Sequence, residues 1–194
     1  MSNSEFLKQI NTYYPLSAET TEALLDICSE ERYQKNELLL EAGSMARYYY
    51  FVKSGLIGYY TIAEDGSSIY KIFFEENSFV ASTSAIIKNE PSDFNIIALE
   101  DCTVIKYPVK AYRALLEKYH DLALFHIQYL ETNWVVKKEP LEVSLKFETA
   151  KQRYLLLLEN KSLYERLKQH HIASYLGITP TQLSRIRKEI NKPV

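Results

Sequence analysis

A series of short apolar segments between residues 33 and 105 most limits what this chain can fold into. The segments are rich in β-branched and aromatic residues, and clusters of Gly, Asn, Asp, Ser and Pro separate them. They are Leu38–Leu40, Tyr48–Val52, Leu56–Ile62, Ile69–Phe74 and Asn95–Leu99. Closely spaced short strands of this kind predict a β-roll or jelly roll, and the Asp65-Gly66 pair between two of them predicts a hairpin turn.

The pattern becomes helical after Pro108. We predict a short helix at 109–118 and a longer one at 121–139, which Pro140 ends or kinks. The longer helix carries a heptad-like apolar stripe at Leu122, Phe125, Tyr129 and Val136. Such a stripe favours a seam between two copies of the chain, and packing of the helix on its own domain is the alternative.

Two further helices are predicted from local signals. Ser17 is a suitable N-cap for a helix that contains Leu24 and Leu25. A helix is also expected at 148–158, where the nearly all-apolar stretch Tyr154–Leu158 indicates burial.

The segment from His171 to Lys188 has the spacing of a helix-turn-helix. Ala173 is small where two helices must cross, and Gly177 lies at the turn, where a left-handed backbone is needed. Thr179 and Gln182 form a capping box around Pro180, at the start of the second helix. The buried stripe expected for that helix is Leu183, Ile186 and Ile190.

The opposite face of the second helix is polar and basic, which suits entry into the major groove of DNA. Arg can contact guanine edges through two hydrogen bonds, and Lys can hold phosphates. The residues expected to contact DNA are Thr179, Thr181, Gln182, Ser184, Arg185, Lys188 and Lys192. The charge distribution agrees, because residues 1–140 carry a net charge of −7 and residues 141–194 carry +5.

These residues resemble the helix-turn-helix of the Crp/Fnr family of transcription regulators, and the resemblance covers almost the whole chain. Tyr49–Gly55 is similar to the strand and turn that enter that family's β-roll, and Ala98–Val104 is similar to its last strands. The resemblance implies an α+β fold with a sensor β-roll at 1–120, a dimerisation helix at 121–140 and a DNA-binding helix-turn-helix at 141–194. It further implies a homodimer on a palindromic double-stranded operator. The family usually adds a β-hairpin wing after the recognition helix; the sequence up to Val194 shows none, and whether the native chain lacks it is left open.

The phosphate-binding cassette of the family is degenerate here. In that cassette a Glu and, further on, an Arg hold the ligand, and Ser82 and Ser92 stand in the matching stretches, with Asp93 adding negative charge. A buried phosphate without a cationic partner is unfavourable, so we expect no ordinary cAMP or cGMP binding unless Arg47 or Lys137 reaches the pocket. The expected lining of the pocket is Phe79, Ala81, Ser82, Thr83, Ser92 and Asp93. The effector remains open, and a neutral or apolar small molecule would suit the aromatic walls.

Other classes of function find little support in the sequence. The four histidines lie outside the predicted strands, so neither a cupin metal site nor a haem site is expected; a haem sensor would have to use His126 of the long helix as its axial ligand. Neither a nucleophile elbow nor a Gly-rich phosphate loop occurs, so we expect no enzymatic activity and no cofactor. The composition, the two separated cysteines and the absence of a membrane-length apolar run or a signal-peptide pattern indicate a cytoplasmic protein. The alternative function is a small-molecule-binding β-roll module without sequence-specific DNA binding.

Overall fold

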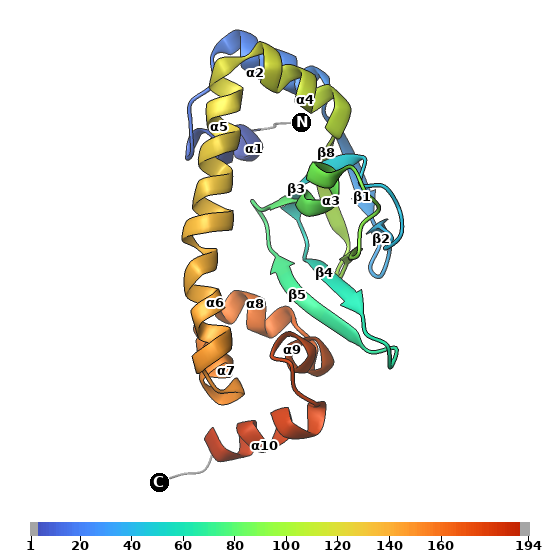
Figure 1. Ribbon diagram of the computed structural model, residues 1–194, viewed down its shortest axis with the longest axis vertical. Coiled ribbons are helices and arrows are strands. Elements are labelled where there is room, and N and C mark those ends of the chain that lie inside the picture. Colours follow the sequence, from blue (N-terminus) through green and yellow to red (C-terminus); the bar gives the residue numbers. More distant parts are fainter. Residues whose placement is uncertain (1–3, 191–194) are drawn as a thin grey trace.

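The computed structural model describes residues 4–190. A β-roll lies beside one long helix, and a group of short C-terminal helices packs near the lower end of that helix (Figure 1). The strands are β1 (Ser29–Tyr33), β2 (Leu38–Leu40), β3 (Tyr48–Ser54), β4 (Ile57–Ile62), β5 (Ser68–Phe74), β6 (Phe79–Val80), β7 (Asn95–Ala98) and β8 (Cys102–Pro108). The predicted α+β fold with an N-terminal β-roll is confirmed.

Two antiparallel sheets form the roll, with strand orders β1-β8-β3-β6 and β2-β7-β4-β5. Strands β4 and β5 form the hairpin expected at Asp65-Gly66, and Gly66 has the positive φ of 81° that this turn requires. Strand β5 is an edge strand, so one row of its backbone groups is left without a strand partner.

Strand β3 is apolar at consecutive positions because both of its faces are covered. Tyr50 and Val52 point into the core between the two sheets, where Val104 and Ile57 also lie. Tyr49 and Phe51 point to the opposite face and pack under the helices at the N-terminal end of the chain. This arrangement explains why the segment shows no alternation of polar and apolar residues.

The helices that cover this outer face are α1 (Ser4–Asn11), α2 (Ala18–Asp26), α4 (Val109–Lys118) and α5 (His120–Leu130); α3 (Thr83–Lys88) lies within the roll. Ser17 caps α2 as predicted, since its side chain accepts from the Thr20 amide. Asp121 at the start of α5 accepts hydrogen bonds from the Ser17 amide at 2.7 Å and the Thr20 hydroxyl at 2.8 Å. These contacts fix the upper end of the long helix to α2.

The long helix does not stop at Pro140. It runs through α5, the π-helical segment η1 (Glu131–Val136) and α6 (Lys138–Phe147), which contains Pro140. Proline lacks an amide hydrogen, and its ring disfavours a normal turn before it. The wider turn in η1, where the Lys137 amide donates to the Thr132 carbonyl at 3.0 Å, directly precedes the proline and accommodates it.

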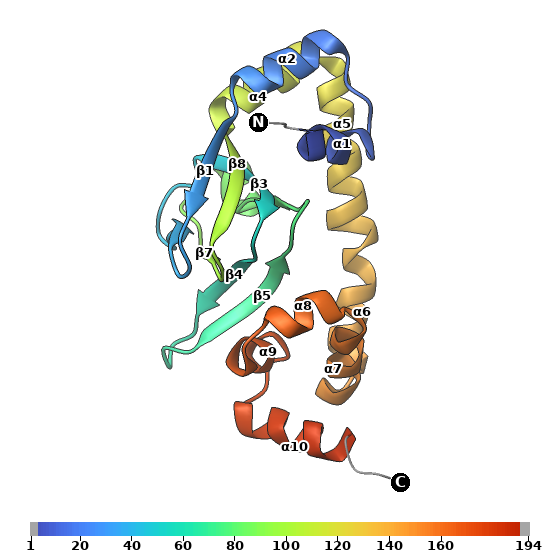
Figure 2. The same ribbon diagram turned by 180° about the vertical axis from the view of Figure 1, so that it is seen from behind.

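The C-terminal helices are α7 (Ala150–Glu159), α8 (Lys161–Arg166), α9 (Gln169–Tyr175) and α10 (Pro180–Ile190). Their apolar core continues into the roll, because Tyr70, Phe73 and Leu99 pack with Ile172 and Leu183 in one cluster. Figure 2 shows α8 and α9 beside β5 from behind.

The predicted burial of the apolar stretch in α7 is only partly right. Tyr154 and Leu157 are buried, but Leu155 and Leu156 are 42% and 51% exposed, because α7 has covering elements on one side only.

Candidate DNA-binding site and sensor pocket

Helices α9 and α10 form the predicted helix-turn-helix. Gly177 has a φ of 68°, a conformation that residues with a Cβ rarely adopt. The Thr179 amide donates to the Gln182 side chain at 2.8 Å, and the Gln182 amide donates to the Thr179 hydroxyl at 3.2 Å, so the capping box forms. Leu183 is fully buried against α9, where Ala173 is 1% exposed. The orientation of α10 is therefore fixed by its cap and its core.

The face of α10 that points away from this core is the candidate DNA-binding surface. Thr181, Arg185 and Lys188 are exposed, and Ser184 is half-buried beside them. Gln182 is exposed, but its side-chain oxygen is used by the Thr179 cap. The predicted contact Lys192 lies outside the described residues.

Arg187 is the cation of α10 that turns inward. Its guanidinium donates to the Tyr154 hydroxyl at 3.1 Å and lies 5.9 Å and 5.8 Å from the Tyr154 and Tyr164 ring centres. This contact ties α10 to α7 and α8. Arg187 therefore stabilises the fold, whereas the exposed Arg185 and Lys188 are free to contact DNA.

The helix-turn-helix is docked on the free edge of the roll. The Ser174 hydroxyl of α9 donates to the Ser68 carbonyl and accepts from the Tyr70 amide at 3.0 Å, so it satisfies backbone groups of the edge strand β5. Next to it, His171 packs edge-on against the Tyr70 ring at 5.0 Å. Burial lowers the pKa of His171 to about 4, and its Nδ1 has no hydrogen-bond partner among residues 4–190.

Arg166 clamps the same interface. Its guanidinium donates to Glu76 at 2.8 Å and to Glu100 at 2.7 Å, and it draws these two carboxylates of the roll towards α8. The pKa of Glu76 is lowered, chiefly because its carboxylate accepts hydrogen bonds from Arg166. No local sequence motif marks Arg166, since its partners are 90 and 66 positions away.

In the roll, the residues at the two cassette positions bind each other. The Ser92 hydroxyl donates to the Ser82 hydroxyl at 2.8 Å, and both residues are 1% exposed. Ser92 also accepts from the Phe94 amide at 3.1 Å, and the Tyr59 hydroxyl lies 3.1 Å from Ser82. Asp93 is exposed. Neutral hydroxyl groups thus satisfy the hydrogen-bonding groups at these positions.

A narrow cleft separates the roll from the long helix, with about 30 Å³ of free space. This is room for one or a few water molecules and is far less than a nucleotide needs. Of the six predicted lining residues, three line it, namely Phe79, Ala81 and Thr83. The remaining walls are mostly aromatic: Tyr49, Tyr107, Tyr112, Phe125, Tyr129 and Trp134, together with Val80, His126 and Leu130.

Comparisons with known proteins agree with this architecture. Residues 30–119 match the family model described as the cyclic nucleotide-binding domain. The regulator CLP from Xanthomonas campestris, described as c-di-GMP responsive, superposes with a TM-score of 0.71 at 16% identity, over 90% of this chain and 91% of that one. The chain has the Crp/Fnr fold. Comparison with curated protein sequences gives no significant match.

Two further structures show the same likeness to the Crp/Fnr fold. FixK2 from Bradyrhizobium japonicum has a TM-score of 0.69 at 17% identity, over 84% of each chain. The catabolite activator protein of Thermus thermophilus has a TM-score of 0.58 at 19% identity, over 94% of this chain and 86% of that one. The resemblance inferred from the sequence is confirmed at the level of the fold.

Within this Crp/Fnr fold, the long helix uses its apolar residues differently from the prediction. Leu122 and Phe125 are 0% and 3% exposed in the single chain, and the Tyr129 hydroxyl donates to the Phe79 carbonyl at 3.3 Å. These three residues pack on the chain's own domain, which is the alternative given above for this helix, and a seam between two copies stays a prediction. Of the predicted stripe, Val136 is exposed, at 64%.

The exposed apolar surface of the helix lies further along. Its members are Ile127, Val135, Val136, Leu141, Val143, Leu145 and Phe147, which are between 49% and 81% exposed. Among them, Val136, Val143 and Phe147 follow heptad-like steps of seven and four, with Pro140 between the first two. In the segment 4–190, no helix combines the length and apolar character needed to cross a membrane.

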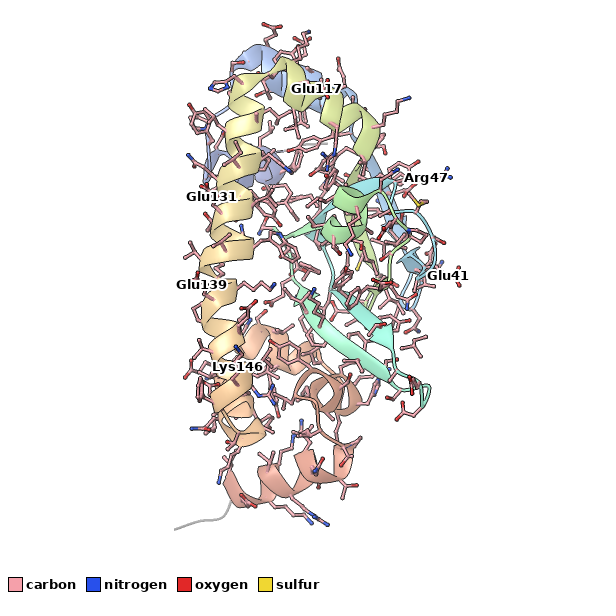
Figure 3. The ribbon with its side chains drawn as sticks, viewed as in Figure 1. Glu41, Arg47, Glu117, Glu131, Glu139 and Lys146 are labelled. Carbon is pink, nitrogen blue, oxygen red and sulfur yellow. The ribbon has the colours of Figure 1, made fainter. Side chains whose placement is uncertain are left out.

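Sequence reasoning missed one cluster in the Crp/Fnr fold. Lys71 of β5 lies among the rings of Tyr59, Phe94 and Trp134, which come from β4, the loop before β7 and η1. The many tyrosines of the sequence indicate aromatic clusters, but they do not show which rings surround Lys71. The two alternative cations do not take this place, because Arg47 projects from the outer side of the roll (Figure 3) and Lys137 donates to Asn133 of its own helix at 2.9 Å.

Proposed function

We propose that this protein is a DNA-binding transcription regulator of the Crp/Fnr type, in which α10 enters the major groove. One observation carries the proposal. Helix α10 is fixed by its cap and by the fully buried Leu183, and it presents Thr181, Arg185 and Lys188 to solvent. A recognition helix needs this combination of a rigid mount and an exposed polar, cationic face.

The proposed binding form is a homodimer on a palindromic operator of double-stranded DNA. Two recognition helices about 34 Å apart would read two half-sites. The exposed apolar residues of α6, including Val143 and Phe147, supply a surface that a second copy can cover. Such a regulator would act in the cytoplasm, through binding rather than catalysis.

The proposed division of labour follows the order of the chain. Residues 1–120 sense, 121–140 connect and begin the dimer surface, which continues along α6 to Phe147, and the C-terminal part of 141–194 binds DNA. The Ser82–Ser92 hydrogen bond and the closed cleft support control by something other than an ordinary cyclic nucleotide.

A gel-shift titration with fragments of the protein's own promoter region tests the proposal. Wild type should bind one fragment at least tenfold more tightly than unrelated DNA of equal length. The double variant Arg185→Ala, Lys188→Ala should lose this preference, whereas Lys161→Ala, at an exposed lysine of α8, should keep it. Equal binding by wild type and the double variant would refute the assignment. Complete absence of DNA binding would favour a small-molecule-binding module instead.

A further inference from the structure

The Lys71 ammonium stands inside a three-sided aromatic cage between the roll and the long helix. Its Nζ lies 5.0 Å from the ring centre of Phe94, 5.6 Å from that of Tyr59 and 5.9 Å from that of Trp134. Cation–π attraction operates at these distances. The cage therefore joins β4, β5 and the loop before β7 to the middle of the long helix.

Two of the rings are held firmly in the roll. Tyr59 stacks on Phe94 with 4.6 Å between ring centres and an interplanar angle of 22°. The hydroxyl of Tyr59 is fixed by Ser82, 3.1 Å away, and the Phe94 amide by Ser92. The cassette serines thus serve to position two rings, and the third ring, Trp134, comes from the long helix.

Within the described part of the chain, the charge in the cage has no counter-ion. Among residues 4–190, no ion pair joins Lys71 to a carboxylate. Burial lowers the pKa of Lys71, and the nearby positive charge of Lys138 lowers it further. Glu131 and Glu139 lie on the side of the long helix away from the roll (Figure 3). An anion placed beside Lys71 would relieve this unbalanced charge.

An anion with an aromatic ring fits both halves of the cluster. The rings of Phe94 and Trp134 offer stacking or edge contacts, and the ammonium offers a charge-assisted hydrogen bond. An organic cation would instead have to displace Lys71 and would meet the repulsion of Lys138. Of the cage residues, Trp134 alone lines the narrow cleft, which has only about 30 Å³ of free space. The ligand must therefore be small and must approach from the solvent-exposed side of Lys71.

We propose that the sensor domain binds a small aromatic carboxylate, whose carboxylate pairs with Lys71 and whose ring contacts Trp134 and Phe94. This inference rests on the sensory role proposed above and names its ligand class. In this protein Lys71 of β5 would bind the anion, in place of the Arg that the family carries in its cassette. The residue before Lys71 is Tyr70, whose amide donates to Ser174 of α9, so the ligand binds one residue away from the docked helix-turn-helix.

Trp134 is the only tryptophan in the sequence, so intrinsic fluorescence reports directly on the cage. The full chain is titrated with benzoate and phenylacetate, and in parallel with acetate, benzyl alcohol and benzyltrimethylammonium. We expect saturable fluorescence changes with at least one aromatic carboxylate. Acetate and benzyl alcohol should bind roughly tenfold or more weakly, since each lacks one of the two contacts.

Substitutions at Lys71 separate the charge from the fold. Lys71→Met should weaken binding of the carboxylate about tenfold or more, and Lys71→Arg should restore most of it. Lys88→Met, at an exposed lysine at the end of α3, is the matched control and should change nothing. Circular dichroism verifies that all three variants fold.

Three results would overturn the proposal. They are the absence of any saturable change in wild type, tighter binding of the cation than of the carboxylates, and unchanged carboxylate binding by a folded Lys71→Met variant. The gel shift described above is independent of this titration. If the gel shift succeeds and the titration fails, the ligand proposal is wrong. If the titration succeeds and the gel shift fails, the DNA-binding proposal is wrong.

Discussion

The hydroxyl of Ser92 donates a hydrogen bond to the hydroxyl of Ser82, with 2.8 Å between the two oxygens, in the interior of the roll. At the positions where the phosphate-binding cassette carries a charged pair, two neutral side chains satisfy each other. Ser82 also contacts the Tyr59 hydroxyl, and Ser92 accepts from the Phe94 amide. The residues at the cassette positions therefore help to position two aromatic side chains.

We expect neither cAMP nor cGMP to bind this protein more tightly than about 1 mM. A buried cyclic phosphate needs a cation or several aimed donors, and loss of a charge-assisted bidentate pair costs about 2–5 kcal/mol. Isothermal titration calorimetry with each nucleotide measures the affinity. A micromolar Kd for either one would contradict this reading of the cassette.

Ser92→Ala should lower the free energy of unfolding by about 1–3 kcal/mol. The substitution removes the donor to Ser82 and leaves the Phe94 amide without the acceptor it has now. Urea denaturation followed by circular dichroism gives the value. Ser67→Ala, in the exposed turn between β4 and β5, is the control and should change stability by less than about 0.5 kcal/mol. Equal effects of the two substitutions would argue against a structural role for the pair.

Single substitutions on α10 should affect DNA binding in different ways. Arg185→Ala should cost about 1–3 kcal/mol at the operator and relax base preference at one position. Lys188→Ala should weaken binding to all sequences and flatten the dependence of affinity on salt. Arg187→Ala should mainly lower thermal stability, because Arg187 contacts Tyr154. Fluorescence anisotropy at several salt concentrations distinguishes these outcomes, and a flattened salt slope for Arg187→Ala alone would reverse the assignment.

The dimer should depend on α6. Val143→Glu combined with Phe147→Glu should give folded monomers in light scattering, because both side chains are exposed in the single chain and would meet a partner. Lys161→Glu, on α8, should leave the dimer intact. Phe125→Glu should disrupt folding, since Phe125 is 3% exposed in the chain's own core. A wild-type protein that is monomeric at tens of micromolar would remove the basis for the dimer.

Acid should loosen the contact between α9 and the roll. The folded protein holds the pKa of His171 at about 4, below its ordinary value of 6.5, because burial disfavours the charged ring. The unfolded or undocked form therefore takes up more protons between these values, so stability is complete above about pH 6.5 and falls as the pH drops towards 4. The Tm should decline over this window, and His171→Gln should flatten the decline. His170→Gln, at the exposed neighbour, should preserve it.

Local signals in the sequence were sufficient for the helix-turn-helix. Its cap at Thr179, its turn at Gly177 and its core residue Leu183 depend on interactions within a few residues of one another. Strands β2, β3, β4, β5 and β7 were predictable for the same reason, because turn residues mark their ends and β-branched or aromatic residues fill them. Strands β1 and β6 were not predicted, and β8 was expected only from the family resemblance.

The partners of each apolar or charged side chain were decided only by the tertiary structure. The stripe at Leu122 and Phe125 is equally apolar whether it faces a second copy or its own roll, and only the position of the roll selects the second arrangement. Arg166 and Lys71 gain their significance from residues on distant elements. Hydrophobic periodicity shows that a face will be buried, but what buries it depends on how the chain brings remote segments together, and this is a property of the whole fold.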